Sequence, residues 1–409
     1  MSLTRNEQNT QIPELGIVGS NAYQNIVSIR KKLSTEGSLP IDQVVDSGVL
    51  PYLIQLGKGT KIHYEIAWIF TNIASGKESH CSYLLEIGAV EYLESLFSYK
   101  NNEIRLQVMW AYGNLLSEKN LSKTVFRKIN RERILEHIKN SKPTFEAKKT
   151  FSFFLSSVVY SGFCKKEILP LEVEFLKSLS IESVDLDSLQ GVAYSSSPTL
   201  ISQYIDEDLV RILLKACESE DKCVYSLRVM VDISRSKKGS KLLLSKGFLE
   251  LLPSFLNQSK QLIVTRSSSV LSNLLSNSSE IFEELNQKGT LSLVVEKLKH
   301  GEKLVREQAL LTLCKCLVSG SKATLARSRV VSRISECLNK PFTNTLKDSI
   351  IAALGKFVFK FDFSVFPDEC HRVCRELEEF LKHSKRPLLK LRNILQRLKS
   401  KADQEDDSI

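Results

Sequence analysis

Apolar residues along this chain recur at intervals of three, four and seven positions over nearly its whole length. This spacing places them on one face of an α-helix, because successive residues are about 100° apart around the helix axis. A half-buried strand would instead alternate strictly between apolar and polar residues, and little of the sequence does so. The pattern therefore predicts an all-α protein built from many amphipathic helices.

Within the helical pattern, a phrase with a central glycine returns. It reads VDSGVLPYLIQL around Gly48, LEIGAVEYLESL around Gly88, LSKGFLELLPSFL around Gly247 and LNQKGTLSLVVEKL around Gly289. The first two glycines lie about 40 residues apart and the last two about 42, a period typical of armadillo and HEAT arrays. We expect a tight turn with positive φ at each glycine, and the same conformation at Asn130, one period after Gly88.

This period predicts the organisation of the chain. We expect an armadillo-type superhelical solenoid of roughly nine repeats of about 42 residues over residues 21–382. A short disordered segment is expected at residues 1–20, and a basic helix with an acidic tail at residues 383–409.

The two tryptophans of the chain fall in the same W-x-x-x-N frame, within EIAWIFTNIASG and QVMWAYGNLLSE. In both copies the neighbouring apolar residues form a stripe suited to the core. Trp68, Asn72 and Ser75 lie off the first stripe, and Trp110 and Asn114 lie off the second. A seam between repeats would also bury such side chains, but large aromatic residues off a core face more often mark contacts with a partner. We therefore interpret both pairs as binding residues.

The stretch from IDQVVDSGVLPYL to EIRLQVMWAYGNLLSE resembles the second and third armadillo repeats of importin-α, the nuclear-import adaptor that binds nuclear localisation signals. The resemblance is specific over residues 25–120 and is one of register up to about residue 360. It implies that the third helix of each repeat lines a concave groove. There, Trp rings would flank the Lys and Arg stems of an extended peptide, and Asn amides would bond its backbone. Cation–π contact suits this role, at roughly 0.5–2 kcal/mol for each Trp.

Carried over position by position, the resemblance implies further contacts in the N-terminal half. Gly76, Cys81 and Glu118 would form a lysine-selective pocket, with Cys81 where the family has Thr and Glu118 where it has Asp. The next pair of positions keeps an aromatic residue at Phe153 but has Ser157 in place of Asn.

The resemblance is weaker further along the chain. Tyr194 stands where the family itself carries Tyr, and Arg228 matches a groove Arg between the family's two binding sites. At the second, minor site both Trp are missing; Asn273 is retained, and Lys315 replaces the other Asn. The sequence therefore predicts one good site, in the N-terminal half, and does not favour signals that need both sites.

The formal net charge of +10 suggests nucleic acid as a partner. The excess is concentrated between Lys382 and Lys401, however, where cationic residues occur without an acid. We interpret this run as a solvated last helix, with a displaced contact to importin-β as the alternative. The basic importin-β-binding segment of the family is not expected here, because Arg5 is the one basic residue before Asn21.

We therefore expect the partners to be cargo proteins with Lys- and Arg-rich signals, with importin-β and an export receptor as further candidates and nucleic acid less favoured. The expected location is cytoplasm and nucleus, with shuttling between them. Two alternatives stay open: an armadillo scaffold or assembly protein that binds other peptides, and nucleic-acid binding through the basic C-terminal segment.

The nine cysteines are scattered and odd in number, so we interpret them as reduced core residues. Cys314 with Cys316, and Cys370 with His371 and Cys374, do not supply the four converging ligands of a closed zinc site. The sequence has no phosphate loop, nucleophile elbow or metal-ligand pattern, and no apolar run of about 18 residues. We expect a non-enzymatic protein without catalytic residue, metal, cofactor or membrane span.

Overall fold

The computed structural model describes residues 21–35, 40–56, 60–141, 143–178, 184–278, 280–319, 330–339, 342–360, 367–383 and 389–406. Every regular element in these ranges is a helix, which confirms the all-α prediction. The chain divides into two compact units, Met1–Ser195 and Ser196–Ile409. The expected N-terminal segment, residues 1–20, lies outside the described residues. Among the described helices, none combines the length and apolar character needed to cross a bilayer.

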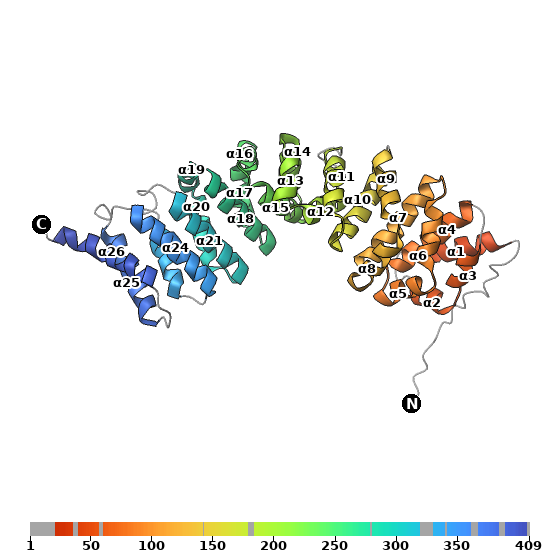
Figure 1. The fold of residues 1–409 in the computed structure, drawn as a ribbon, viewed down its shortest axis with the longest axis horizontal. Helices are drawn as coiled ribbons and strands as arrows, with labels where there is room; N and C mark the ends of the chain where they lie inside the picture. The colour runs from red at the N-terminus through yellow and green to blue at the C-terminus, as the bar shows by residue number, and fades with distance from the viewer. Residues whose placement is uncertain are drawn as a thin grey trace, which may run out of the picture. The chain divides into compact units, whose positions relative to one another are not determined.

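The first unit is built from short and long helices that follow one another in a repeating order. They are α1 (Ala22–Leu33), α2 (Ile41–Asp46), α3 (Leu50–Gln55), α4 (Thr60–Ala74), α5 (Glu78–Glu86), α6 (Ala89–Phe97), α7 (Asn102–Ser117), α8 (Lys119–Lys128), α9 (Arg131–Asn140), α10 (Phe145–Tyr160), α11 (Lys165–Ser178) and α12 (Leu186–Ser195). Two shorter helices precede each of the long helices α4, α7 and α10. Each long helix packs on the next, with α1 before α4 and α12 after α10 (Figure 1).

The second unit repeats this arrangement. Its helices are α13 (Pro198–Ile201), α14 (Glu207–Ala216), α15 (Glu220–Ile233), α16 (Lys237–Ser245), α17 (Phe248–Leu256), α18 (Gln261–Asn277), α19 (Ile281–Gln287), α20 (Thr290–Glu296), α21 (Lys303–Ser319), α23 (Val330–Glu336), α24 (Asn344–Lys360), α25 (Pro367–His383) and α26 (Leu389–Asp406), with 3₁₀ turns at Ser202–Tyr204, Lys297–Lys299 and Cys337–Asn339. Helices α15, α18, α21 and α24 pack on one another in sequence.

The predicted glycine turns are confirmed. Gly48, Gly88, Gly247 and Gly289 all have positive φ, between 69° and 89°. The same expectation for Asn130 is wrong, because its φ is −83°. Instead, its side-chain oxygen accepts a hydrogen bond from the Arg133 backbone N–H and caps α9. A polar side chain at this position stabilises the helix start as an N-cap without a left-handed residue.

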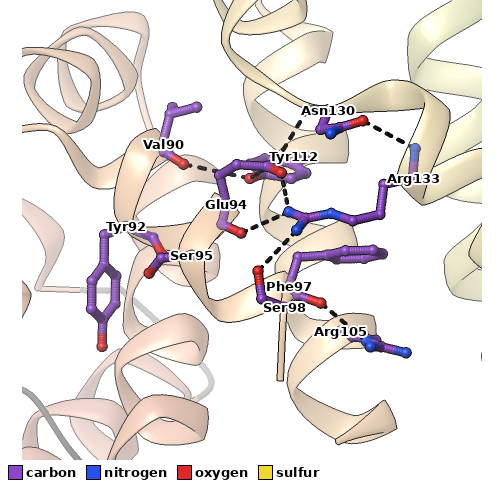
Figure 2. A network of polar contacts seen from close by, with 10 residues as sticks. All are labelled: Val90, Tyr92, Glu94, Ser95, Phe97, Ser98, Arg105, Tyr112, Asn130 and Arg133. Carbon is purple, nitrogen blue, oxygen red and sulfur yellow. Dashed lines mark hydrogen bonds and ion pairs between the residues drawn. The ribbon is translucent and has the colours of Figure 1, made fainter. Parts of the chain in front are cut away.

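Polar side chains fix α7 against its neighbours. Tyr112 is fully buried, and its hydroxyl donates to Glu94 on α6 at 3.2 Å. Figure 2 shows the same carboxylate meeting Arg133 and the backbone N–H of Asn130. Arg133 also donates to Ser98 at 2.8 Å. Because Tyr112 is tied to α6 and α9 on the buried side of α7, the opposite face, which carries Trp110, is held outward.

The basic helix at the end of the chain belongs to the fold. Leu391, Ile394 and Leu398 on α26 are buried, and α26 packs on α24 and α25. Lys399 forms an ion pair with Glu378 at 2.5 Å. The described cations of α26 therefore project from a helix whose apolar face is part of the core of the second unit.

Candidate functional site

A hollow of about 620 Å³ opens between α1, α4 and α7 in the first unit. We call it the Trp hollow because both tryptophans line it. Its lining side chains come from the end of α1 and from the outer faces of α4 and α7, and they are Leu33, Ser34, Thr35, Tyr64, Trp68, Thr71, Asn72, Ser75, Gln107, Trp110 and Asn114. The structure thus brings together five predicted site residues from two repeats. None of these lining residues is acidic.

Trp68 is half-buried and already has a cationic neighbour. The guanidinium carbon of Arg30, on α1, lies 4.4 Å from the centre of the Trp68 ring. Arg30 is held there by Glu65, whose carboxylate accepts from its Nε at 2.8 Å. Tyr64 meets the same indole edge-on at 5.6 Å. One part of the Trp68 ring therefore shows, within the protein, the cation–π contact that we expect a basic peptide to make.

Trp110 is the more open of the two rings. Half of its surface, 50%, is exposed, and Phe153 on α10 meets it edge-on at 6.4 Å. Phe153 lies against Gly113, where any larger residue would overlap the phenyl ring. Gly113 therefore allows α10 to bring Phe153 beside Trp110, so the two rings form a short aromatic row.

The asparagine amides bond the protein itself. Asn114 donates from Nδ2 to the carbonyl oxygen of Thr71 at 3.0 Å, and Asn72 donates from Nδ2 to Ser34 Oγ at 3.1 Å. An amide has two N–H donors and one carbonyl acceptor. Each amide therefore retains a donor and an acceptor for a ligand after making its bond within the chain.

A polar contact sets the spacing of α4 and α7 below the hollow. Gln107 donates from Nε2 to the Thr71 hydroxyl at 2.8 Å. The same hydroxyl lies 3.2 Å from the backbone carbonyl oxygen of Gln107. Together with the bond from Asn114 to Thr71, these contacts tie the two Trp-bearing helices together.

The three residues assigned to a lysine pocket differ in exposure. Cys81 is fully buried, and its thiol donates to the Ala74 carbonyl oxygen at 3.3 Å. Burial, followed by the charges of Glu118 and Glu78, raises the pKa of Cys81 to about 12. Glu118 is half-buried at the start of α8, one turn beyond Asn114. A ligand in this region would meet Glu118 and not the Cys81 thiol.

Gly76 has a packing role of its own. A side chain at this position would overlap the ring of His80. His80 accepts from the Lys77 backbone N–H at 3.1 Å and lies 2.7 Å from Asp42 Oδ1. Lys77 and His80 hold the pKa of the Asp42 carboxyl below its usual value through these bonds. Gly76 therefore lets the turn after α4 close on α2 and α5.

The remaining predicted residues of the first unit lie outside the Trp hollow. Ser157 is buried, and its hydroxyl donates to the Phe153 carbonyl oxygen at 2.9 Å. Tyr194 is half-buried and meets Tyr160 at 5.4 Å between ring centres. Lys119 lies 5.5 Å above the Tyr160 ring.

Arg228 and Asn273 lie in the second unit, and both are engaged there. Arg228 donates to Asp232 at 2.7 Å, and the same buried carboxylate accepts from Ser196 at 2.9 Å. Asn273 donates from Nδ2 to the Val231 carbonyl oxygen at 3.1 Å. This bond matches that of Asn114 to Thr71. In both cases the Asn side chain donates to a backbone carbonyl of the preceding long helix.

Sequence reasoning missed Arg30 and Glu65. Arg30 lies about 42 residues before Asn72, so the repeat period already places it at the equivalent position of the preceding repeat. Its contact with Trp68 was therefore open to prediction from the period. Glu65, by contrast, stands beside the core stripe of α4, and only the packing of α1 on α4 shows why a buried acid is tolerated there.

The cysteine pair considered for zinc is enclosed in the second unit. Cys314 and Cys316 are both buried on α21. Burial raises the pKa of Cys314 to about 12. In the described part of the chain, no group of three or more His, Cys, Asp or Glu side chains is arranged to hold a metal ion. The side chain of Cys370 lies outside the described residues.

Sequence comparison links part of the chain to importin-α proteins. Importin subunit alpha-6 of Arabidopsis thaliana is 38% identical over 94 residues, which are 22% of this chain and 18% of that protein. The probable importin subunit alpha-A of Dictyostelium discoideum is 36% identical over 99 residues, 24% of this chain and 18% of its own length. Importin subunit alpha-1b of Oryza sativa subsp. japonica is 38% identical over 92 residues, 22% and 17% of the two lengths. The match thus spans less than a fifth of each of these relatives.

Structural comparison shows a likeness of fold over most of the chain. The crystal structure of an engineered protein matches with a TM-score of 0.70 over 95% of this chain and 97% of its own, at 17% sequence identity. Such a likeness concerns the fold alone. No family model matches the chain. The chain is therefore an armadillo-like helical-repeat protein that contains a segment similar to importin-α.

Proposed function

We propose that this protein binds Lys- and Arg-rich peptide segments in the Trp hollow and acts as an adaptor between proteins with nuclear localisation signals and a transport receptor. The observation that carries the proposal is the convergence of both W-x-x-x-N pairs on one hollow of about 620 Å³. The partial similarity to importin subunits supports the same class of ligand.

The lining of the hollow suits the stem and the charge of a basic side chain. The lining residues are neutral, so the exposed face of Trp110 and the part of the Trp68 ring that Arg30 leaves uncovered are the groups that attract a cation. Arg30 over Trp68 is an internal example of that contact. The amides of Asn72 and Asn114 each keep a donor and an acceptor, which suits the backbone of an extended peptide.

At the edge of the Trp hollow, Glu118 is proposed to select a positively charged side chain. Glu118 lies one turn beyond Asn114, half-buried, where its carboxylate could pair with a lysine ammonium beside Gly76. The buried Cys81 side chain would then pack beneath this pocket without touching the ligand. Along the same unit, the aromatic row continues to Phe153, and Tyr194 would extend it towards α12.

The chain offers a direct test, because its two tryptophans both line the hollow. Intrinsic tryptophan fluorescence of the full chain is followed on titration with a Lys- and Arg-rich peptide, and with the same peptide carrying Gln at every basic position. We expect a saturable change with the basic peptide alone. An equal change with the Gln peptide, or no change with either, would refute the proposed ligand class.

The adaptor role needs a second measurement. Purified importin-β is passed over the immobilised full chain with and without the basic peptide. Retention of importin-β supports the adaptor role. Peptide binding without retention contradicts it and leaves an armadillo scaffold that binds basic peptides.

A further inference from the structure

A second hollow, on a different part of the first unit, begins with the turn that ends α10. The Gly162 backbone N–H bonds the Val159 carbonyl at 2.9 Å, and that of Phe163 bonds the Val158 carbonyl at 3.2 Å. Gly162 has a φ of 92°, so this is a Schellman turn with glycine in the left-handed position. Cys164 also has positive φ, at 51°, and α11 begins directly after it.

The turn brings Phe163 onto the side chain of Phe126 from α8. Their rings are parallel within 7°, with centres 4.0 Å apart. The guanidinium carbon of Arg131, at the start of α9, lies 5.3 Å from the centre of the Phe126 ring. The sequence SGFCKK thus does more than end a helix. It builds a half-buried aromatic pair and places two lysines at the first turn of α11.

A hollow of about 670 Å³ lies over this aromatic pair, and its charge is strongly one-sided. Five cationic residues and one acidic residue line it: Lys123, Arg127, Arg131, Lys165, Lys166 and Glu167. Arg131 pairs with the neighbouring Glu132 at 2.9 Å. In the described part of the chain, the other four cations form no ion pair. We call this site the basic hollow.

The combination indicates the chemistry of a ligand. Clustered cations without acidic partners repel one another and favour a polyanionic partner. The volume exceeds that of a single small ion and is in the range of pockets that take several groups. The half-buried phenyl rings at its base offer an apolar surface, which a ligand with charge alone would not use.

We propose that the basic hollow binds an acidic protein segment, with Asp or Glu carboxylates on the lysines and arginine at its rim and an apolar side chain packed against those parts of the Phe126 and Phe163 rings that line the hollow. Single-stranded nucleic acid is the rival polyanion. It gains much of its affinity from bases stacked on free aromatic faces. Here Phe163 covers one face of Phe126 and Arg131 lies over that ring too, so stacking is restricted.

The test compares two variants of the full chain that lose the same charge. The first changes Lys123, Arg127, Lys165 and Lys166 to Gln. The control changes Arg235, Lys237, Lys238 and Lys241 to Gln; these are exposed residues in and beside α16 of the second unit. Binding of a fluorescent peptide of alternating Glu and Leu is measured by anisotropy at about 0.15 M ionic strength. A peptide with Gln for Glu and an oligothymidine strand serve as further probes.

We expect the first variant to lose at least about tenfold in affinity for the Glu-Leu peptide, and the control to bind like the wild type. Weak binding of the Gln peptide to all three proteins supports the role of charge. Equal losses in both variants would refute the site, as would no binding to the wild type. Tighter binding of oligothymidine, lost in the first variant alone, would overturn the acidic-peptide assignment in favour of nucleic acid.

The apolar part of the proposal has its own variant. Phe163→Ala is expected to weaken binding of the Glu-Leu peptide more than binding of a Glu-Gly peptide of the same charge. Unfolding followed by tryptophan fluorescence shows whether the variant keeps its fold. A folded variant that loses both peptides equally would contradict the apolar contact. The ligand proposed for the basic hollow is acidic, whereas the ligand proposed for the Trp hollow is basic. A negative result here therefore leaves the proposed function untouched.

Discussion

Glu172 on α11 leads to the sharpest stability prediction. Its side chain is fully buried, and neither carboxyl oxygen has a hydrogen-bond partner among the described residues. Gly191 on α12 faces it so closely that a larger residue would overlap the carboxyl group. Burial, followed by the charge of Asp185, raises the pKa of Glu172 well above its ordinary value, and the nearby Ser152 hydroxyl offsets this rise only in part. The folded protein therefore keeps this carboxyl protonated at a pH where the unfolded chain has ionised it.

The sign of the pH effect follows from this difference. A glutamate in the unfolded chain has a pKa of about 4.3. Below that pH, Glu172 is protonated in both the folded and the unfolded state, so it does not change the free energy of unfolding with pH. Above it, the unfolded state loses the proton while the folded state retains it. The free energy of unfolding then falls by about 1.4 kcal/mol for each pH unit until the folded pKa is reached.

The assay uses Glu172→Gln, with Glu174→Gln on the same helix as the matched control, because Glu174 is exposed. Urea unfolding is followed at a series of pH values by tryptophan fluorescence, since both tryptophans lie in the same compact unit as Glu172. We expect Glu172→Gln to lose this contribution, so that its stability relative to the wild type increases as pH rises. The control should follow the wild type. Identical pH dependence in all three proteins would refute a neutral buried carboxyl.

Two further predictions concern the Trp hollow. Trp110→Ala should weaken a Lys-rich peptide about tenfold, or about 1.4 kcal/mol, with little change in the urea midpoint because the ring is half exposed. Tyr52→Ala removes an aromatic ring that is 63% exposed outside the hollow, and should leave the affinity unchanged; equal effects of both changes would contradict the assignment. Arg30→Gln should lower the free energy of unfolding by about 1–3 kcal/mol, because buried Glu65 loses its partner. Adding Glu65→Gln should recover most of that loss, and no recovery would argue against the ion pair as the cause.

Helical periodicity was enough to predict the class of fold and the turn glycines, because both follow from local geometry. An amphipathic stripe fixes which face of a helix is buried, and a left-handed residue between two helices strongly favours glycine. Asn130 shows the limit of that argument. Its position in the period was right, but a side-chain cap replaced the left-handed turn. Local sequence allowed both solutions, and only the packed structure distinguishes them.

The site was less predictable, since periodicity says which face a residue occupies but not what covers that face. Trp68 and Trp110 were assigned to the same outward face, yet Trp68 is covered in part by Arg30 while Trp110 is not. Cys81 was expected beside a ligand and is enclosed instead. In both cases the deciding contact comes from another helix, and no pattern within one helix contains it.

The asparagines of the W-x-x-x-N frame carry less functional information than the tryptophans. Asn114 donates to the Thr71 carbonyl of the preceding long helix, and Asn273 donates to the Val231 carbonyl in the same way. Ser269 stands in the Trp position before Asn273, so the second unit keeps the Asn contact without the aromatic ring. An Asn at this position therefore stabilises the packing of successive long helices whether or not a ligand binds. It follows that the inference of a basic-peptide site in the first unit rests on Trp68 and Trp110, and that substitutions of the Trp rings are its proper test.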